Sequence, residues 1–150
     1  LSKQPLMRSV LVDLLVESEA SVSLAIRLAK AIDVQYNENH DKASRKTESD
    51  FARIALAVSK YFVCKRTPTV VAEALESHGG NGYIEDSHMP RFYRQAPLNS
   101  IWEGSGNVIC LDVVRAKHNI PNLLEELHST RGGRCLSRSC LRLIMSQLST

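Results

Sequence analysis

The sequence predicts an all-α fold on two observations. Apolar residues recur three or four positions apart along most of its 150 residues, and no segment of any length alternates with the two-residue period of a strand. A chain of this length fits one domain. It has no apolar run of about 18 residues, and its first residues lack the pattern of a signal peptide. We therefore expect no membrane span and a location in the cytoplasm or mitochondrial matrix rather than secretion.

The first helix is expected from Leu6 to about Tyr36, where apolar side chains fall at helical spacing. Pro5 suits the first position of this helix, because a helix leaves its first backbone N–H groups unpaired. The polar segment 37–46, "NENHDKASRK", is rich in turn-forming residues. It is predicted to be a solvated loop.

A second helix is expected to begin at Thr47, since T-E-S-D resembles a capping box with Asp50 in place of glutamate. Its apolar stripe comprises Phe51, Ile54, Ala55, Val58 and Phe62. Thr67-Pro68 favours a break and a third helix that extends to His78, because proline removes a backbone donor. One continuous helix kinked at Pro68 is the alternative.

Residues 78–107 then interrupt the helical pattern with five of the seven glycines and the only tryptophan. In "HGGNGY", Gly79 and Gly80 are expected to end the preceding helix through positive φ angles. The same G-G-x-G turn could present backbone N–H groups to a phosphate, although a helix precedes it here instead of a strand. Farther along, Arg91 and Arg94 are expected to form ion pairs that fix a short turn.

The segment "IWEGSGN" holds a candidate general base. Trp102 could bury apolar area beside the carboxylate of Glu103, and burial raises a carboxyl pKa toward the value that a base needs. Ser105 or Asn107 is a natural cap for the next helix. The alternative is that Glu103 only complements the dipole of that helix.

Further helices are expected at 107–119, 121–128 and 135–148. The excess of basic residues belongs to the end of the chain, where residues 131–150 carry four arginines and no acid. The four cysteines form no C-x-x-C pair, so reduced thiols are expected, and the scattered histidines indicate no metal site.

Two stretches of the interruption together resemble a known family. "HGGNGYIED" and "MPRFYRQAPLNSIWEGSGNVICLDVVRA" resemble the C-terminal helical domain of flavin-dependent acyl-CoA dehydrogenases, and are most similar to its AidB-like and isovaleryl-CoA-dehydrogenase-like branch. The resemblance implies an up-and-down helical bundle over residues 1–119 that lacks the first helix of that domain. Residues 120–150 form a tail that matches nothing in the family.

The resemblance also implies roles for individual residues. Glu103 corresponds to the base that removes the α-proton of an acyl-CoA in many family members, whereas other members carry the base on an earlier helix. Glu103 and Gly104 would contact the substrate. FAD contacts are implied for two segments, comprising Glu76, Ser77, His78, Gly79 and Gly80, which face the FAD of a neighbouring subunit, and Ser105, Gly106 and Asn107, which face the subunit's own FAD.

One position departs from the family. Glu76 stands where glutamine is common, and a carboxylate there would repel a pyrophosphate. Because the family's flavin-contacting arginine would precede residue 1, we expect the chain alone to bind FAD weakly and to be inactive.

The leading hypothesis is therefore a part of an acyl-CoA dehydrogenase that assembles as a dimer or tetramer and forms a 2,3-enoyl-CoA. Two other hypotheses are nucleic-acid binding through the arginine-rich tail, which is less favoured, and an oligomerisation bundle without chemistry.

Overall fold

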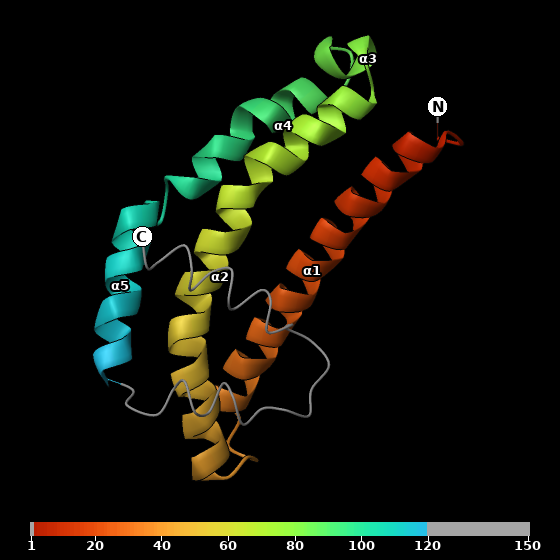
Figure 1. Ribbon diagram of the computed structural model, residues 1–150. Coiled ribbons are helices and arrows are strands. Elements are labelled where there is room, and N and C mark those ends of the chain that lie inside the picture. Colours follow the sequence, from red (N-terminus) through yellow and green to blue (C-terminus); the bar gives the residue numbers. More distant parts are fainter. Residues whose placement is uncertain (1, 120–150) are drawn as a thin grey trace. The chain divides into compact units, whose positions relative to one another are not determined.

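The computed structural model describes residues 2–119, which form helices and no strand, so the expected all-α fold is confirmed (Figure 1). The long helices are α1 (Pro5–Tyr36) and α2 (Lys42–Ser77). Two short helices, α3 (Gly80–Tyr83) and α4 (Met89–Gln95), are followed by the 3₁₀ helix η1 (Ala96–Ser100) and by α5 (Gly106–Asn119). The first helix has the bounds that apolar spacing predicted to within one residue, and the helix after the interruption begins within one residue of its predicted start.

Helix α2 begins earlier than expected, inside the segment 37–46 that was predicted to be a loop. The helix begins at Lys42, so residues 42–46 are helical and Thr47 is not its cap. Asp41 takes that role, because its carboxylate accepts hydrogen bonds from the backbone N–H of Ser44 at 2.8 Å and from the hydroxyl of Ser44 at 2.7 Å. These bonds satisfy a donor that the helix leaves unpaired, and they lower the pKa of Asp41.

The expected break at Pro68 is also wrong, because α2 continues through it to Ser77. The Thr67 hydroxyl donates to the carbonyl oxygen of Val63 at 2.7 Å, one turn earlier. Side-chain bonds of this kind accompany bends that accommodate an internal proline. The helical spacing of apolar residues on both sides of Pro68 therefore belongs to one helix of 36 residues.

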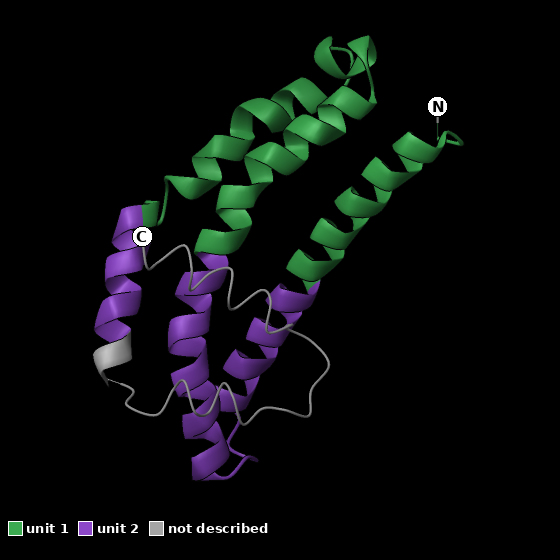
Figure 2. Cartoon of the chain, viewed as in Figure 1, with its two compact units in different colours: residues 1–22, 61–106 green, residues 23–60, 107–150 purple. Residues whose placement is uncertain are grey.

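The chain divides into two compact units, which Figure 2 colours separately. The unit of residues 23–60 and 107–150 has a small core where Ile54 and Ala116 are buried and Val58 and Val113 pack against them. Ion pairs accompany this core. Arg27 binds Glu48 with two hydrogen bonds of 2.8 and 3.1 Å.

In the same unit, the guanidinium of Arg27 also lies 4.1 Å from the centre of the Phe51 ring. Arg53 binds Asp112 of α5 with two hydrogen bonds of 2.8 and 2.7 Å. The hydrogen bonds from Arg53 lower the pKa of Asp112. Helix α2 is thus tied to α1 and to α5 by bidentate pairs, whose fixed geometry gives orientation more than stability.

The unit of residues 1–22 and 61–106 repeats this arrangement. Arg66 of α2 makes a bidentate pair with Glu17 of α1, and its guanidinium lies 5.1 Å from the centre of the Phe62 ring. Within the described residues, no helix is long and apolar enough to cross a membrane, and no cluster of three potential metal ligands occurs. The helices expected at 121–128 and 135–148, and the arginine-rich tail, lie outside the described residues.

Candidate cofactor and active site

The first candidate segment is the end of α2. Gly79 adopts a φ of 59°, in the left-handed region that favours glycine, and so ends the helix as expected. Gly80 differs from the expectation, because its φ is not positive and it begins α3. Backbone bonds close the turn, from Gly79 N to Glu76 O at 2.8 Å and from Gly82 N to Gly79 O at 2.9 Å.

The side chains of this segment are mostly committed to the helix that carries them. The Ser77 hydroxyl donates to the Glu73 carbonyl at 2.9 Å. The His78 Nδ1 donates to the Ala74 carbonyl at 2.8 Å, so Nε2 is the ring nitrogen without a bond to the helix. Glu76 is exposed. Both backbone groups of Gly79 and the carbonyl of Gly80 are already hydrogen-bonded, so the groups that remain open to a ligand are a carboxylate, one imidazole nitrogen and the backbone N–H of Gly80.

Two glycines of the turn serve different purposes. A Cβ on Gly82 would lie 2.3 Å from the carbonyl oxygen of Leu75, so this buried glycine lets α3 pack on the last turn of α2. A Cβ on Gly80 would meet nothing within 4 Å. Neither backbone angle nor internal packing requires glycine at position 80. Close approach of another molecule would require it.

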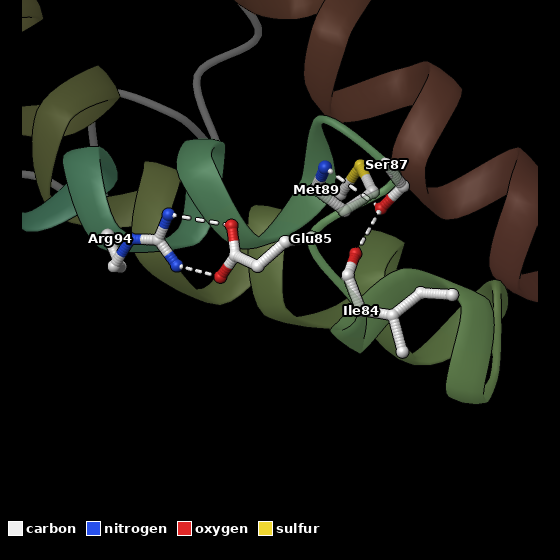
Figure 3. Close-up of polar contacts among 5 residues, drawn as sticks. All are labelled: Ile84, Glu85, Ser87, Met89 and Arg94. Carbon is white, nitrogen blue, oxygen red and sulfur yellow. Dashed lines mark hydrogen bonds and ion pairs between the residues drawn. The ribbon is translucent and has the colours of Figure 1, made fainter.

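Residues 84–88 connect α3 to α4, and polar contacts hold this connection to α4 (Figure 3). Arg94 binds both carboxylate oxygens of Glu85, at 2.6 and 3.1 Å, and these bonds lower the pKa of Glu85. The Ser87 hydroxyl donates to the Ile84 carbonyl at 3.4 Å, and the backbone N–H of Met89 donates to the Ser87 oxygen at 3.4 Å. The expected role of Arg94 in an ion pair is thereby confirmed, although the segment is helical rather than a simple turn.

The corresponding expectation for Arg91 is not met, because no ion pair of this side chain occurs within residues 2–119. Arg91 is exposed on α4.

The second candidate segment follows η1. Glu103 has a φ of 55° and is the only residue other than glycine with a positive φ in the described part of the chain. Gly104 follows with a φ of 104°. Left-handed backbone is uncommon for residues with a side chain and costs on the order of 1 kcal/mol or more. Such strain clusters at functional sites, where it orients a group.

The surroundings of Glu103 differ from the expectation that Trp102 would be buried beside it. Trp102 is 57% exposed, and Glu103 is exposed as well. Tryptophan presents the same large apolar face whether another part of the chain covers it or not, so sequence alone could not separate the two cases. Residues 2–119 therefore supply the position of the carboxylate but not an apolar cover for it.

Helix α5 begins at Gly106, which places the exposed Ser105 at the cap position and Asn107 in the first turn. A Cβ on Gly106 would lie 3.0 Å from Cε2 of Tyr61 and 3.1 Å from Cε of Lys65. Sequence reasoning did not single out Tyr61 as a site residue. Its spacing of four from Lys65, on one face of α2, was the available signal.

The two candidate segments lie far apart along α2. Gly82 packs against Leu75 near the end of α2, whereas Gly106 packs against Tyr61. Leu75 lies fourteen positions after Tyr61 on α2, which corresponds to about 21 Å of helix at 1.5 Å per residue. The structure therefore does not gather all of the candidate residues at one point.

The fold and these segments define a class: a helical bundle that presents a glycine turn at the end of one long helix and a strained glutamate before another. The family model described as acyl-CoA dehydrogenase, C-terminal domain, matches residues 1–118. The chain belongs to this family, as its motifs predicted.

Individual relatives agree with this assignment. The chain is 45% identical over 115 residues to a protein of Escherichia coli named putative acyl-CoA dehydrogenase AidB. The aligned segment covers 77% of the chain and 20% of that relative. The chain is 32% identical over 123 residues to acyl-CoA dehydrogenase family member 11 of Caenorhabditis elegans, with coverage of 82% and 19%.

A solved structure of Caenorhabditis elegans ACDH-11 in complex with C11-CoA superimposes with a TM-score of 0.77 at 30% identity, over 85% of the chain and 21% of that protein. The Bd2924 apo-form gives a TM-score of 0.79 at 26% identity, over 99% of the chain and 29% of that protein. The chain thus spans about a fifth of the length of the curated relatives named above.

Proposed function

We propose that the chain is the flavin- and substrate-contacting helical part of an acyl-CoA dehydrogenase, which converts an acyl-CoA thioester to a 2,3-enoyl-CoA within a dimer or tetramer. The observation that carries this proposal is the left-handed backbone of Glu103, the residue that the family motif marks as the base. Membership of the family and the similarity to a protein solved with C11-CoA support the substrate class.

The residues present fit FAD in part. The open backbone at Gly80 suits a pyrophosphate, because a negatively charged group can approach N–H donors there without meeting a Cβ. Glu76 does not suit it, since its carboxylate is exposed in the same turn and carries like charge. The separation of about 21 Å between the two segments supports contacts with two different places, as the family's two-subunit arrangement implies.

In this proposal Glu103 accepts the α-proton of the thioester on a carboxylate oxygen, while bound FAD supplies the acceptor for the β-hydrogen as hydride. The strained backbone directs the carboxylate before substrate arrives, and so reduces the reorganisation that proton transfer requires. Gly104 allows the thioester to approach the backbone closely. Ser105, Gly106 and Asn107 would contact FAD from the start of α5.

The test uses the protein with every residue that its gene encodes, loaded with FAD. Acyl-CoA substrates should bleach the flavin absorbance, and deuterium from D₂O should enter the α-position of the thioester. Glu103→Gln should abolish this exchange while FAD remains bound, because the amide cannot accept the proton. Glu73→Gln, an exposed glutamate on α2, is the matched control and should exchange normally.

Two results would contradict the proposal separately. Flavin that no acyl-CoA reduces would contradict the activity, whereas normal exchange in Glu103→Gln would move the base to another residue. The weak FAD binding expected of the 150 residues alone is checked by the absorbance spectrum of the purified chain, and a stoichiometric yellow protein would refute it.

A further inference from the structure

The start of α5 rests on the side of α2. Gly106 lies against the ring of Tyr61, where a Cβ on Gly106 would come within 3.0 Å of Cε2 and 3.5 Å of Cδ2. Contacts at 3.0 Å are tighter than ordinary van der Waals separations between carbon atoms, which are about 3.5 Å or more. A side chain at position 106 would therefore require the Tyr61 ring to shift by a few tenths of an ångström.

The contact between Gly106 and Tyr61 lies close in sequence to Glu103, the glutamate with a positive φ. Gly106 lies three positions after Glu103, and Gly104 between them has its own positive φ. A left-handed residue persists only where the surrounding structure fixes the chain on both sides. On one side, the backbone N–H groups of Ile101 and Trp102 bind the Leu98 carbonyl of η1 at 2.9 and 3.2 Å.

On the other side of Glu103, the packing of Gly106 on Tyr61 holds the first residue of α5 against α2. We propose that Tyr61 is a positioning residue for Glu103: its ring seats Gly106 and thereby fixes the strained turn that aims the carboxylate. This inference rests on the proposed function for what Glu103 does, but the conformational part can be measured without any activity.

Trp102 provides the readout, because it is the only tryptophan and adjoins Glu103. Its indole N–H gives a single cross-peak in the ¹H–¹⁵N spectrum of the 150-residue chain. Tyr61→Ala should move this peak by more than its line width or split it, since the turn loses the contact that holds Gly106. Tyr61→Phe keeps the ring and should leave the peak in place.

The matched control is Tyr36→Ala, which removes a tyrosine that is 72% exposed at the end of α1. An unmoved indole peak in Tyr61→Ala, in a chain whose helical circular dichroism is unchanged, would overturn the inference. So would an equal shift in Tyr36→Ala.

A second variant keeps the inference testable if Tyr61→Ala fails to fold. Gly106→Ala adds a Cβ against the ring and should also shift the indole peak. In the double variant Gly106→Ala/Tyr61→Leu, the smaller side chain makes room for the methyl group, so the effects of the two changes should be non-additive. Strictly additive shifts would mean that the two residues do not act through one contact.

The catalytic consequence is measured in the complete FAD-loaded protein. Tyr61→Ala should lower kcat for flavin reduction by about tenfold to a hundredfold, with KM for acyl-CoA within about twofold, because misplacing a base by about 1 Å has effects of this size. Tyr61→Phe should restore kcat. A moved indole peak without a change in kcat would refute the positioning role while leaving the base assignment of Glu103 intact, and Glu103→Gln tests that assignment by itself.

Discussion

Replacing Glu103 by glycine should stabilise the chain although it removes the proposed base. The left-handed conformation at a φ of 55° costs a residue with a side chain about 1 to 2 kcal/mol, and glycine adopts it without that cost. Glycine loses about 0.5 to 1 kcal/mol through its greater freedom in the unfolded chain. The difference predicts a gain of about 0.5 to 1 kcal/mol in the free energy of unfolding.

Urea unfolding followed by circular dichroism measures this gain, and for a chain of this length about 1 kcal/mol raises Tm by about 2 to 4 °C. Glu19→Gly is the matched control. Glu19 is exposed inside α1, where glycine should cost about 0.5 to 1 kcal/mol. The two substitutions should therefore differ in sign, and a loss of stability in both variants would refute the interpretation of Glu103 as strained.

Other substitutions probe the framework that supports the site. Ile54→Ala should lower the free energy of unfolding by about 2 to 4 kcal/mol in a urea titration, because Ile54 is 7% exposed and packs in one cluster with Ala116. Asp41→Ala should cost about 1 kcal/mol in the same assay through the lost cap of α2, and Asp41→Asn much less. Arg66 lowers the pKa of Glu17 below its ordinary 4.5, so the pair stabilises the fold by up to about 1 kcal/mol above that pH and ceases to do so as pH falls through the lowered pKa. Thermal melts of the chain and of Glu17→Gln should accordingly differ at neutral pH and converge in acid; a constant difference would contradict the assignment.

Much of the fold could be predicted from the sequence, because helical spacing of apolar residues is a repeated signal. The bounds of α1 and the start of α5 followed from it to within one residue, and the glycine at position 79 gave the end of α2. Starts and interruptions depend on single side chains instead. Both Asp41 and Thr47 are good caps, and only the structure shows which one bonds to the first turn.

Pro68 shows a second limit of local reasoning. A proline inside a helix loses one backbone hydrogen bond, at a cost of about 3 kcal/mol, whereas the packing of a helix of 36 residues involves many contacts. Sequence patterns measure the local cost and not the packing gained elsewhere along the chain.

The candidate site was predictable only as far as its motifs reach. The family motif marked Glu103, but nothing in the letters W-E-G indicates a positive φ at a glutamate, which is an uncommon conformation for that residue type. The contact between Gly106 and the Tyr61 ring could not be predicted either, since it joins positions 45 residues apart. Contacts between distant segments need the fold before they can be found.

The glycines of the interruption show how structure separates internal needs from external ones. Gly79 and Gly104 are explained by positive φ angles, and Gly82 and Gly106 by neighbours that a Cβ would meet. Gly80 has neither explanation, because its φ is ordinary and its surroundings are open. Where the chain itself does not require a glycine, contact with a bound molecule is the remaining structural reason for having one. Among the proposed FAD contacts, the one at Gly80 is therefore the one that internal packing does not already account for, and the one at Gly106 has a competing structural reason in Tyr61.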